Sequence, residues 1–294
     1  TALRRLLYYL AVFRPDRCFP GKGFHFIDWL ARQRAELPRT ALYPKDVAKA
    51  FSLYSGLPEE LIADDRALAS DTIAARLGAA VVGQPSACAT CARLLARFKA
   101  RLTDPQKPLG SLLFVGPTGV GKTELAKELT RFLFGDAQRL IRLDMSEYMS
   151  PGSAARLTEV GGGGQSLAAR IRQQPLSVVL FDEIEKAHPQ VFDVLLGILG
   201  EGRLTDNLGR LVDLRMTVII LTSNLGVSET PPVGFGERIQ DDFLTQVKQH
   251  FRPEFFNRLD GVEVFSPLGP EDIEAIVELE LRVPTENSER VAER

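Results

Sequence analysis

The sequence has little of what several protein classes require. Among its 294 residues there are three cysteines, Cys18, Cys88 and Cys91, and three histidines. So sparse and odd a cysteine count argues against a disulfide framework and favours a reducing compartment, which predicts a cytoplasmic setting. Cys88 and Cys91 form a C-x-x-C pair, but no second Cys or His pair completes a zinc site. We therefore interpret this pair as helix packing.

Long apolar runs and an excess of one charge are also missing. The apolar stretch at residues 6–13 is far shorter than the roughly 20 residues that a membrane helix needs. Lys plus Arg number 36 and Asp plus Glu 38, giving a formal net charge of −2. The sequence therefore predicts neither a membrane span nor a nucleic-acid partner. Because the first residue is Thr1, we expect a processed chain or a fragment.

The order of apolar segments predicts an α/β fold. Helical patterns fill residues 1–37, with a second helix expected at 24–36, and a mostly helical connector follows at 38–76. Beyond it, apolar strands alternate with helices, which indicates a five-stranded parallel sheet between helices in a core at 77–268. The expected strands are 112–115, 140–144, 177–181, 217–222 and 261–265.

A glycine-rich motif follows the first of these strands and opens a helix. It fits the pattern G-x-x-x-x-G-K-[ST] in the context that such a phosphate-binding loop requires. Its backbone N–H groups can surround phosphates, while Lys122 reaches the β- and γ-phosphates and Thr123 ligates Mg²⁺. We therefore predict an ATP site that includes the motif and the next residue, Gly116, Pro117, Thr118, Gly119, Val120, Gly121, Lys122, Thr123 and Glu124.

The third expected strand ends in two carboxylates, Asp182 and Glu183. This is a Walker B arrangement, in which Asp182 holds Mg²⁺, directly or through water. Glu183 is the predicted general base that polarises the attacking water.

Three further residues are candidates for catalysis. Asn224 follows the fourth strand, at the sheet edge where ligands bind, and can orient water or simply form a turn. Arg252 and Arg258 can act as arginine fingers on a neighbouring subunit's nucleotide. The residues alone favour surface salt bridges for both, for example with Glu254 or Asp260.

The ordered set of motifs resembles the Clp family of AAA+ protein unfoldases, in particular the second ATPase module of its two-ring members. Residues 12–34 resemble the end of the preceding module's helical lid, which assigns 1–37 to that lid. Residues 269–294 resemble the start of an incomplete C-terminal helical lid. The stretches that carry the resemblance are 116–125, 180–189, 202–206, 221–226 and 251–260.

The resemblance implies a homo-hexameric ATPase that remodels or unfolds protein clients, with each nucleotide at a subunit boundary. It makes Asn224 the sensor asparagine and Arg258 the finger, with Arg252 nearby. It also places residues 81–84, with Val81 and Val82 as site residues, beside the adenine, where backbone groups contact the base.

Departures from the family pattern bear on protein threading. Where the family carries an aromatic pore loop, residues 158–166 are glycine-rich and contain no aromatic side chain. An alternative function is therefore a nucleotide-switched assembly or regulatory ATPase that does not thread polypeptide.

The family's nucleotide-sensing lid arginine has no equivalent. Val233-Gly234-Phe235 resembles the tripeptide by which some members dock a peptidase.

Overall fold

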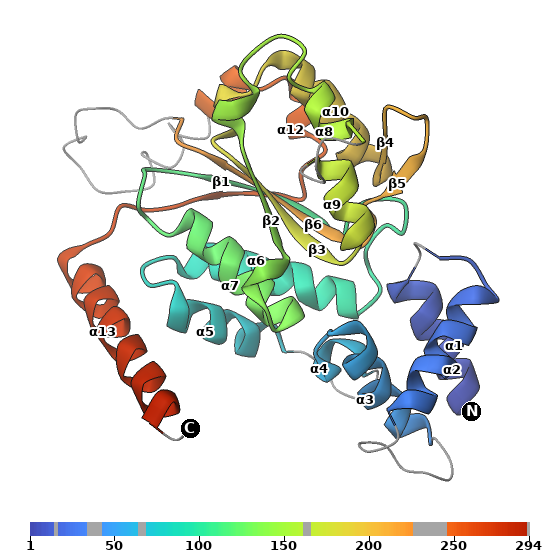
Figure 1. Ribbon diagram of the computed structural model, residues 1–294. Helices are drawn as coiled ribbons and strands as arrows, with labels where there is room; N and C mark the ends of the chain where they lie inside the picture. The colour runs from blue at the N-terminus through green and yellow to red at the C-terminus, as the bar shows by residue number, and fades with distance from the viewer. Residues whose placement is uncertain (15–16, 34–42, 64–68, 161–165, 226–245, 293–294) are drawn as a thin grey trace.

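A five-stranded sheet lies at the centre of the molecule (Figure 1). The computed structural model describes residues 1–14, 17–33, 43–63, 69–160, 166–225 and 246–292. The strands are β1 (Gly110–Val115), β2 (Leu140–Asp144), β3 (Ser177–Asp182), β6 (Thr217–Ser223) and β7 (Gly261–Val264). All neighbouring strands are parallel, in the order β2-β3-β6-β1-β7. The predicted parallel sheet is therefore confirmed.

Both faces of the sheet are buried. In β1, Leu112 and Phe114 join one hydrophobic cluster, whereas Leu113 and Val115 join the other. Side chains alternate between faces along a strand, so a strand covered on both sides must be apolar throughout. This explains why the strands appear in the sequence as continuous apolar runs.

Helices cover both faces of the sheet. One face packs on α6 (Pro85–Lys99) and α7 (Lys122–Phe134), with α5 (Ser70–Ala80) beyond them. The other face packs on α9 (Leu167–Gln173), α10 (Pro189–Glu201) and α12 (Pro253–Phe256). Short elements complete this part: η1 (Ala137–Arg139), η2 (Met145–Tyr148), η3 (Ile184–Lys186), α8 (Ala155–Thr158) and the antiparallel pair β4 (Arg203–Thr205) and β5 (Leu211–Asp213).

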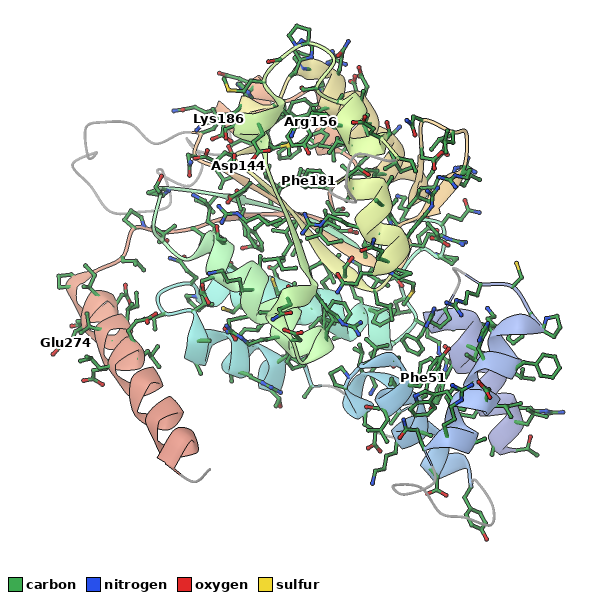
Figure 2. All side chains as sticks on the ribbon, viewed as in Figure 1. Phe51, Asp144, Arg156, Phe181, Lys186 and Glu274 are labelled. Atoms are coloured by element: carbon green, nitrogen blue, oxygen red, sulfur yellow. The ribbon has the colours of Figure 1, made fainter. Side chains whose placement is uncertain are left out.

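An aromatic cluster joins the N-terminal helices to the core. Phe51 is fully buried, and its ring centroid lies 5.5 Å from that of Tyr9 and 5.8 Å from that of Phe13 (Figure 2). Phe13 also contacts Phe98 of α6, with ring centroids 6.1 Å apart. The helices of this region are α1 (Ala2–Phe13), α2 (Gly21–Arg32), α3 (Pro44–Ser55) and α4 (Glu59–Ile62).

The helix predicted at 24–36 is wrong at both ends, because α2 runs from Gly21 to Arg32. Glycine is tolerated in a first turn, where the leading backbone N–H groups have no helical partner. Helix α5 runs across the domain boundary predicted at position 76. The four domain ranges given above stay predictions.

Cys88 and Cys91 are buried in α6 as free thiols, and burial raises the pKa of Cys88 to about 11. The helix-packing interpretation is confirmed. Helix α13 (Pro270–Ala292) stands apart from the sheet in Figure 1. Within the described ranges, no helix combines the length and apolar character needed to cross a bilayer.

Candidate functional site

The glycine-rich loop lies at the carboxyl end of β1. Gly116, Gly119 and Gly121 have φ angles of 149°, 82° and 99°, which side-chain-bearing residues rarely adopt. A Cβ atom on Gly116 would lie 2.6 Å from the carbonyl oxygen of Phe265, so glycine is required there. Gly121 is the N-cap of α7, whose first backbone N–H groups have no helical acceptor. The loop and helix together form an anion-binding concavity.

The ammonium group of Lys122 is buried in this concavity. It donates to the carbonyl oxygens of Gly116 and Pro117, the latter at 2.7 Å, and to Asn224 Oδ1 at 2.7 Å. A side chain at the end of β6 is therefore tied directly to the loop after β1. The parallel register explains this, because Val115 and Ser223 lie side by side at the carboxyl edge.

The electrostatic surroundings of Lys122 act in opposite directions. Burial lowers the pKa of Lys122 to about 8, although the carboxylates of Glu185, Asp182 and Glu183 raise it. Three nearby carboxylates thus keep a buried ammonium group partly compensated. Phosphate oxygens would add further negative charge at the same place.

Asp182 ends β3, and both of its carboxylate oxygens have partners. Oδ1 accepts a hydrogen bond from the Thr222 hydroxyl, and Oδ2 lies 2.6 Å from Arg142 Nη2. Thr222 belongs to β6 and Arg142 to β2, the strands on either side of β3. Three adjacent strands therefore fix this carboxylate at the edge of the cleft.

Glu183 adopts a left-handed backbone conformation, with φ 57° and ψ 52°. Its Oε1 accepts from Asn224 Nδ2 at 3.1 Å, and its Oε2 lies 2.6 Å from Lys186 Nζ. Its backbone N–H donates to the Thr222 hydroxyl at 3.0 Å. Strained backbone of this kind concentrates at functional sites and needs surrounding contacts to hold it.

These groups line a cleft of about 480 Å³. Its predicted lining residues are Thr118, Gly119, Gly121, Lys122, Thr123, Glu124, Asp182, Glu183 and Asn224. Arg142 and Asp144 also line it, although no sequence motif singles them out. Figure 2 shows Asp144 and Lys186 at this edge of the sheet. Hydrogen bonds from Ser146 lower the pKa of Asp144, which keeps it ionised.

The segment predicted to lie beside the adenine packs against the glycine-rich loop. Val81 is buried, and its Cγ1 would lie 3.2 Å from a Cβ atom on Gly121. Val82 is half-buried next to it. Gln84 donates to the backbone oxygens of Val120 at 3.2 Å and Ser266 at 2.9 Å. Gln84 belongs to the predicted adenine-side segment, but these side-chain hydrogen bonds could not be predicted, because their acceptors are remote in sequence.

The two candidate finger arginines do not line the cleft. Both are exposed and contact α10: Arg252 Nη1 lies 3.2 Å from Asp193 Oδ1, and Arg258 donates to the carbonyl oxygen of Leu196. These contacts differ from the salt bridges with Glu254 or Asp260 that the sequence suggests. The finger role of either arginine stays a prediction.

Two predicted elements lie outside the described residues. One is the glycine stretch at 161–164, and the other is Val233-Gly234-Phe235.

Comparison with known proteins places this geometry in a family. The family model described as "AAA domain (Cdc48 subfamily)" matches residues 107–262. The chaperone protein ClpB of Corynebacterium diphtheriae is 45% identical over 244 residues, covering 81% of this chain and 28% of that protein. ClpB of Meiothermus ruber is 44% identical over 273 residues, covering 88% of this chain and 31% of that protein.

Solved structures agree with the sequence relatives. The Saccharomyces cerevisiae Hsp104–ADP complex superposes with a TM-score of 0.81 at 30% identity, covering 98% of this chain and 52% of that one. A closed-state reconstruction of Hsp104 with ATPγS and FITC-casein gives a TM-score of 0.78 at 29% identity, covering 97% and 51%.

The chain belongs to the AAA domain family, Cdc48 subfamily, and is an AAA+ P-loop ATPase. Within that class it is a Clp/Hsp100-type chaperone module, as the similarity to ClpB and Hsp104 shows. The resemblance drawn from the motifs is thereby confirmed. The chain spans less than a third of the length of either of these two ClpB proteins.

Proposed function

We propose that this site binds ATP with Mg²⁺ and hydrolyses the γ-phosphate bond. The observation that carries the proposal is the chain of contacts from Lys122 through Asn224 to Glu183, within one cleft. It links the phosphate-binding loop to the candidate base through the candidate sensor. Such positioning and electrostatic stabilisation are what phosphoryl transfer requires from a protein.

The residues present fit both ATP and Mg²⁺. Apart from its two chain neighbours, no described residue has an atom within 4 Å of where a Cβ on Gly119 would be, so the glycine loop leaves room for phosphates. Thr123 and Asp182 supply the oxygen ligands that Mg²⁺ prefers, with Asp182 acting directly or through water. When bound, Mg²⁺ neutralises negative charge on the phosphate oxygens.

The catalytic steps then fall to this chain's own side chains. The loop N–H groups and Lys122 bind phosphate oxygens, and Glu183 accepts a proton from the attacking water. Asn224 orients that water from the end of β6. Arg258, with Arg252 as second candidate, faces away from its own cleft and supplies positive charge to a neighbouring subunit's nucleotide.

We further propose that hydrolysis drives remodelling or unfolding of protein clients by a homo-hexameric ring in the cytoplasm. Support comes from the ClpB relatives, which are chaperones, and from the Hsp104 structure that contains casein. The three free cysteines are compatible with a reducing compartment. Docking of a peptidase through Val233-Gly234-Phe235 stays a prediction.

The test is ATP-dependent loss of fluorescence from a stably folded, tagged fluorescent protein. The full-length protein is compared with its Glu183→Gln variant, and phosphate release is measured in parallel. We expect fluorescence to fall with the wild type alone. If ATP is consumed but fluorescence persists across tags and clients, the nucleotide-switched alternative replaces remodelling. If no ATP is consumed, the proposed hydrolysis is wrong.

A further inference from the structure

Glu185 is an acidic residue to which the sequence assigns no role, and it contacts the cleft-lining residue Asn224 without lining the cleft itself. It lies in η3, the short helix that follows β3 directly. Its Oε1 accepts a hydrogen bond from the backbone N–H of Asn224 at 3.0 Å. The two residues are 39 positions apart in sequence, so this contact exists only because β3 and β6 are neighbours.

Two glutamates of one short segment hold the same asparagine. Glu183 binds the side chain of Asn224, with 3.1 Å between Oε1 and Nδ2, and Glu185 binds its backbone. An extended strand would continue past the cleft, but the left-handed conformation of Glu183 turns the chain into η3. The turn brings both carboxylates to the end of β6.

The second oxygen of Glu185 shows that hydrogen bonds do not fully satisfy this carboxylate. Its Oε2 is buried and finds no hydrogen-bond partner among the residues that the structure describes. Leaving a buried acceptor unpaired destabilises a fold, and native proteins do so rarely. Together with the strained backbone of Glu183, it marks a local arrangement held for function rather than for folding.

We propose that Glu185 is a positioning residue that fixes the backbone of Asn224 relative to the Walker B carboxylates. The inference rests on the proposed ATPase function. The Asn224 amide is engaged at both ends, by Lys122 at Oδ1 and by Glu183 at Nδ2. A backbone shift at Asn224 would therefore move the amide away from both, and a displacement of about 1 Å can cost about a hundredfold in rate.

The test uses two conservative variants of the full-length protein to separate the length of the side chain at position 185 from its charge. Glu185→Asp keeps the charge but shortens the side chain by one methylene, whereas Glu185→Gln keeps the reach and an acceptor oxygen. For Glu185→Asp we expect kcat to fall about tenfold or more, with KM changed by less than about twofold. For Glu185→Gln at saturating nucleotide we expect kcat within about threefold of the wild type, because its amide oxygen can accept the same hydrogen bond. Bound phosphate then keeps Lys122 charged although the Glu185 carboxylate is lost.

A second measurement does not depend on turnover. Hydrogen exchange of the backbone N–H of Asn224, followed by NMR, should accelerate in Glu185→Asp and stay slow in Glu185→Gln. Only Glu185→Gln retains the hydrogen bond from this N–H to residue 185. Glu147→Asp is the matched control, because Glu147 lies in the short helix η2 and pairs with Arg156 outside the cleft. Neither measurement should change in this control.

The reverse pattern, loss in Glu185→Gln and retention in Glu185→Asp, would overturn the proposal, because Glu185 would then support turnover through its charge on Lys122 and not through its hydrogen bond to Asn224. In an Asn224→Ala background, Glu185→Asp should lower kcat little further, and an additive loss would also contradict positioning through Asn224. If the wild type shows no turnover, the proposed function fails, whereas the exchange measurement still decides whether Glu185 holds Asn224.

Discussion

The nucleotide cleft and the N-terminal aromatic cluster show two ways of fixing side chains in one molecule. In the cleft, Lys122, Asn224 and Glu183 are held by directional hydrogen bonds between different strand ends. In the aromatic cluster, Phe51 is held by rings whose centroids lie 5.5 Å to 6.1 Å away. The first arrangement depends on the position of single atoms, and the second on filled volume.

This difference shows that the residues placed for chemistry and the residues that stabilise the fold lie in separate parts of the molecule. Buried rings contribute mainly the free energy of removing apolar surface from water. The cleft and the residues next to it instead contain a buried ammonium group, a strained backbone and a carboxylate oxygen with no hydrogen-bond partner in the described part of the chain, all of which oppose folding. Substitutions in the two regions should therefore change different measured quantities.

Arg258 should give one of the two largest effects, and it tests whether catalysis is confined to the cleft of one chain. We expect Arg258→Ala to leave nucleotide affinity unchanged but to slow hydrolysis about a thousandfold in the assembled ring, because a trans-acting arginine stabilises transition-state charge. Phosphate release is measured for the ring and for a dilute, dissociated sample. Normal turnover in the ring would move the finger elsewhere, with Arg252 tested next.

Glu183→Gln should slow turnover by about a thousandfold while nucleotide binding persists, because the amide cannot accept the water's proton. Fluorescent-nucleotide titration and single-turnover hydrolysis measure the two quantities. Glu201→Gln is the matched control, since Glu201 pairs with Arg203 on the surface and does not line the cleft. Retained turnover in Glu183→Gln would refute its assignment as base.

Phe51→Ala should lower the free energy of unfolding by about 3–5 kcal/mol, because it leaves a cavity among buried rings. Nucleotide affinity of the folded protein should stay the same. Phe24→Ala, at a side chain that is 67% exposed on α2, should cost less than about 0.5 kcal/mol. Denaturant unfolding measures both, and weakened nucleotide binding by folded Phe51→Ala would mean that the two regions are coupled.

Lys122→Ala should weaken nucleotide binding about a hundredfold, which corresponds to loss of a charged hydrogen bond to phosphate. Arg131→Ala, on the exposed side of α7, should bind normally. Since the pKa of Lys122 is about 8 without nucleotide, wild-type affinity should also fall as pH rises through that value. Isothermal titration at several pH values checks both expectations, and a flat pH profile would contradict the second.

The sheet and the glycine loop could be predicted because their signals are local. Short continuous apolar runs such as residues 112–115 are typical of strands covered on two faces, and the loop motif combines spacing with position. The hairpin of β4 and β5 was missed because strands of three residues show no periodicity. Helix α5 was missed because its pattern of buried positions is weak, with only Ile73 and Leu77 fully buried.

Within the site, the contacts that the sequence did not predict share a different cause. Arg142, Gln84 and Glu185 act on partners 40, 182 and 39 positions away, respectively. Nothing in their own neighbourhoods in the sequence indicates those contacts, which arise from strand order. Asn224, by contrast, was recognisable because it stands at the end of an apolar strand.

The backbone of Glu183 limits which replacements can serve as hydrolysis-deficient reagents. A β-branched residue at this position would be strained in the left-handed region, so its effect would mix local unfolding with lost chemistry. Glycine would relax the backbone, but it would also release the turn that presents Glu185. Glutamine alters the proton acceptor and leaves the backbone preference nearly unchanged, which makes it the replacement of choice for capturing the nucleotide-bound state.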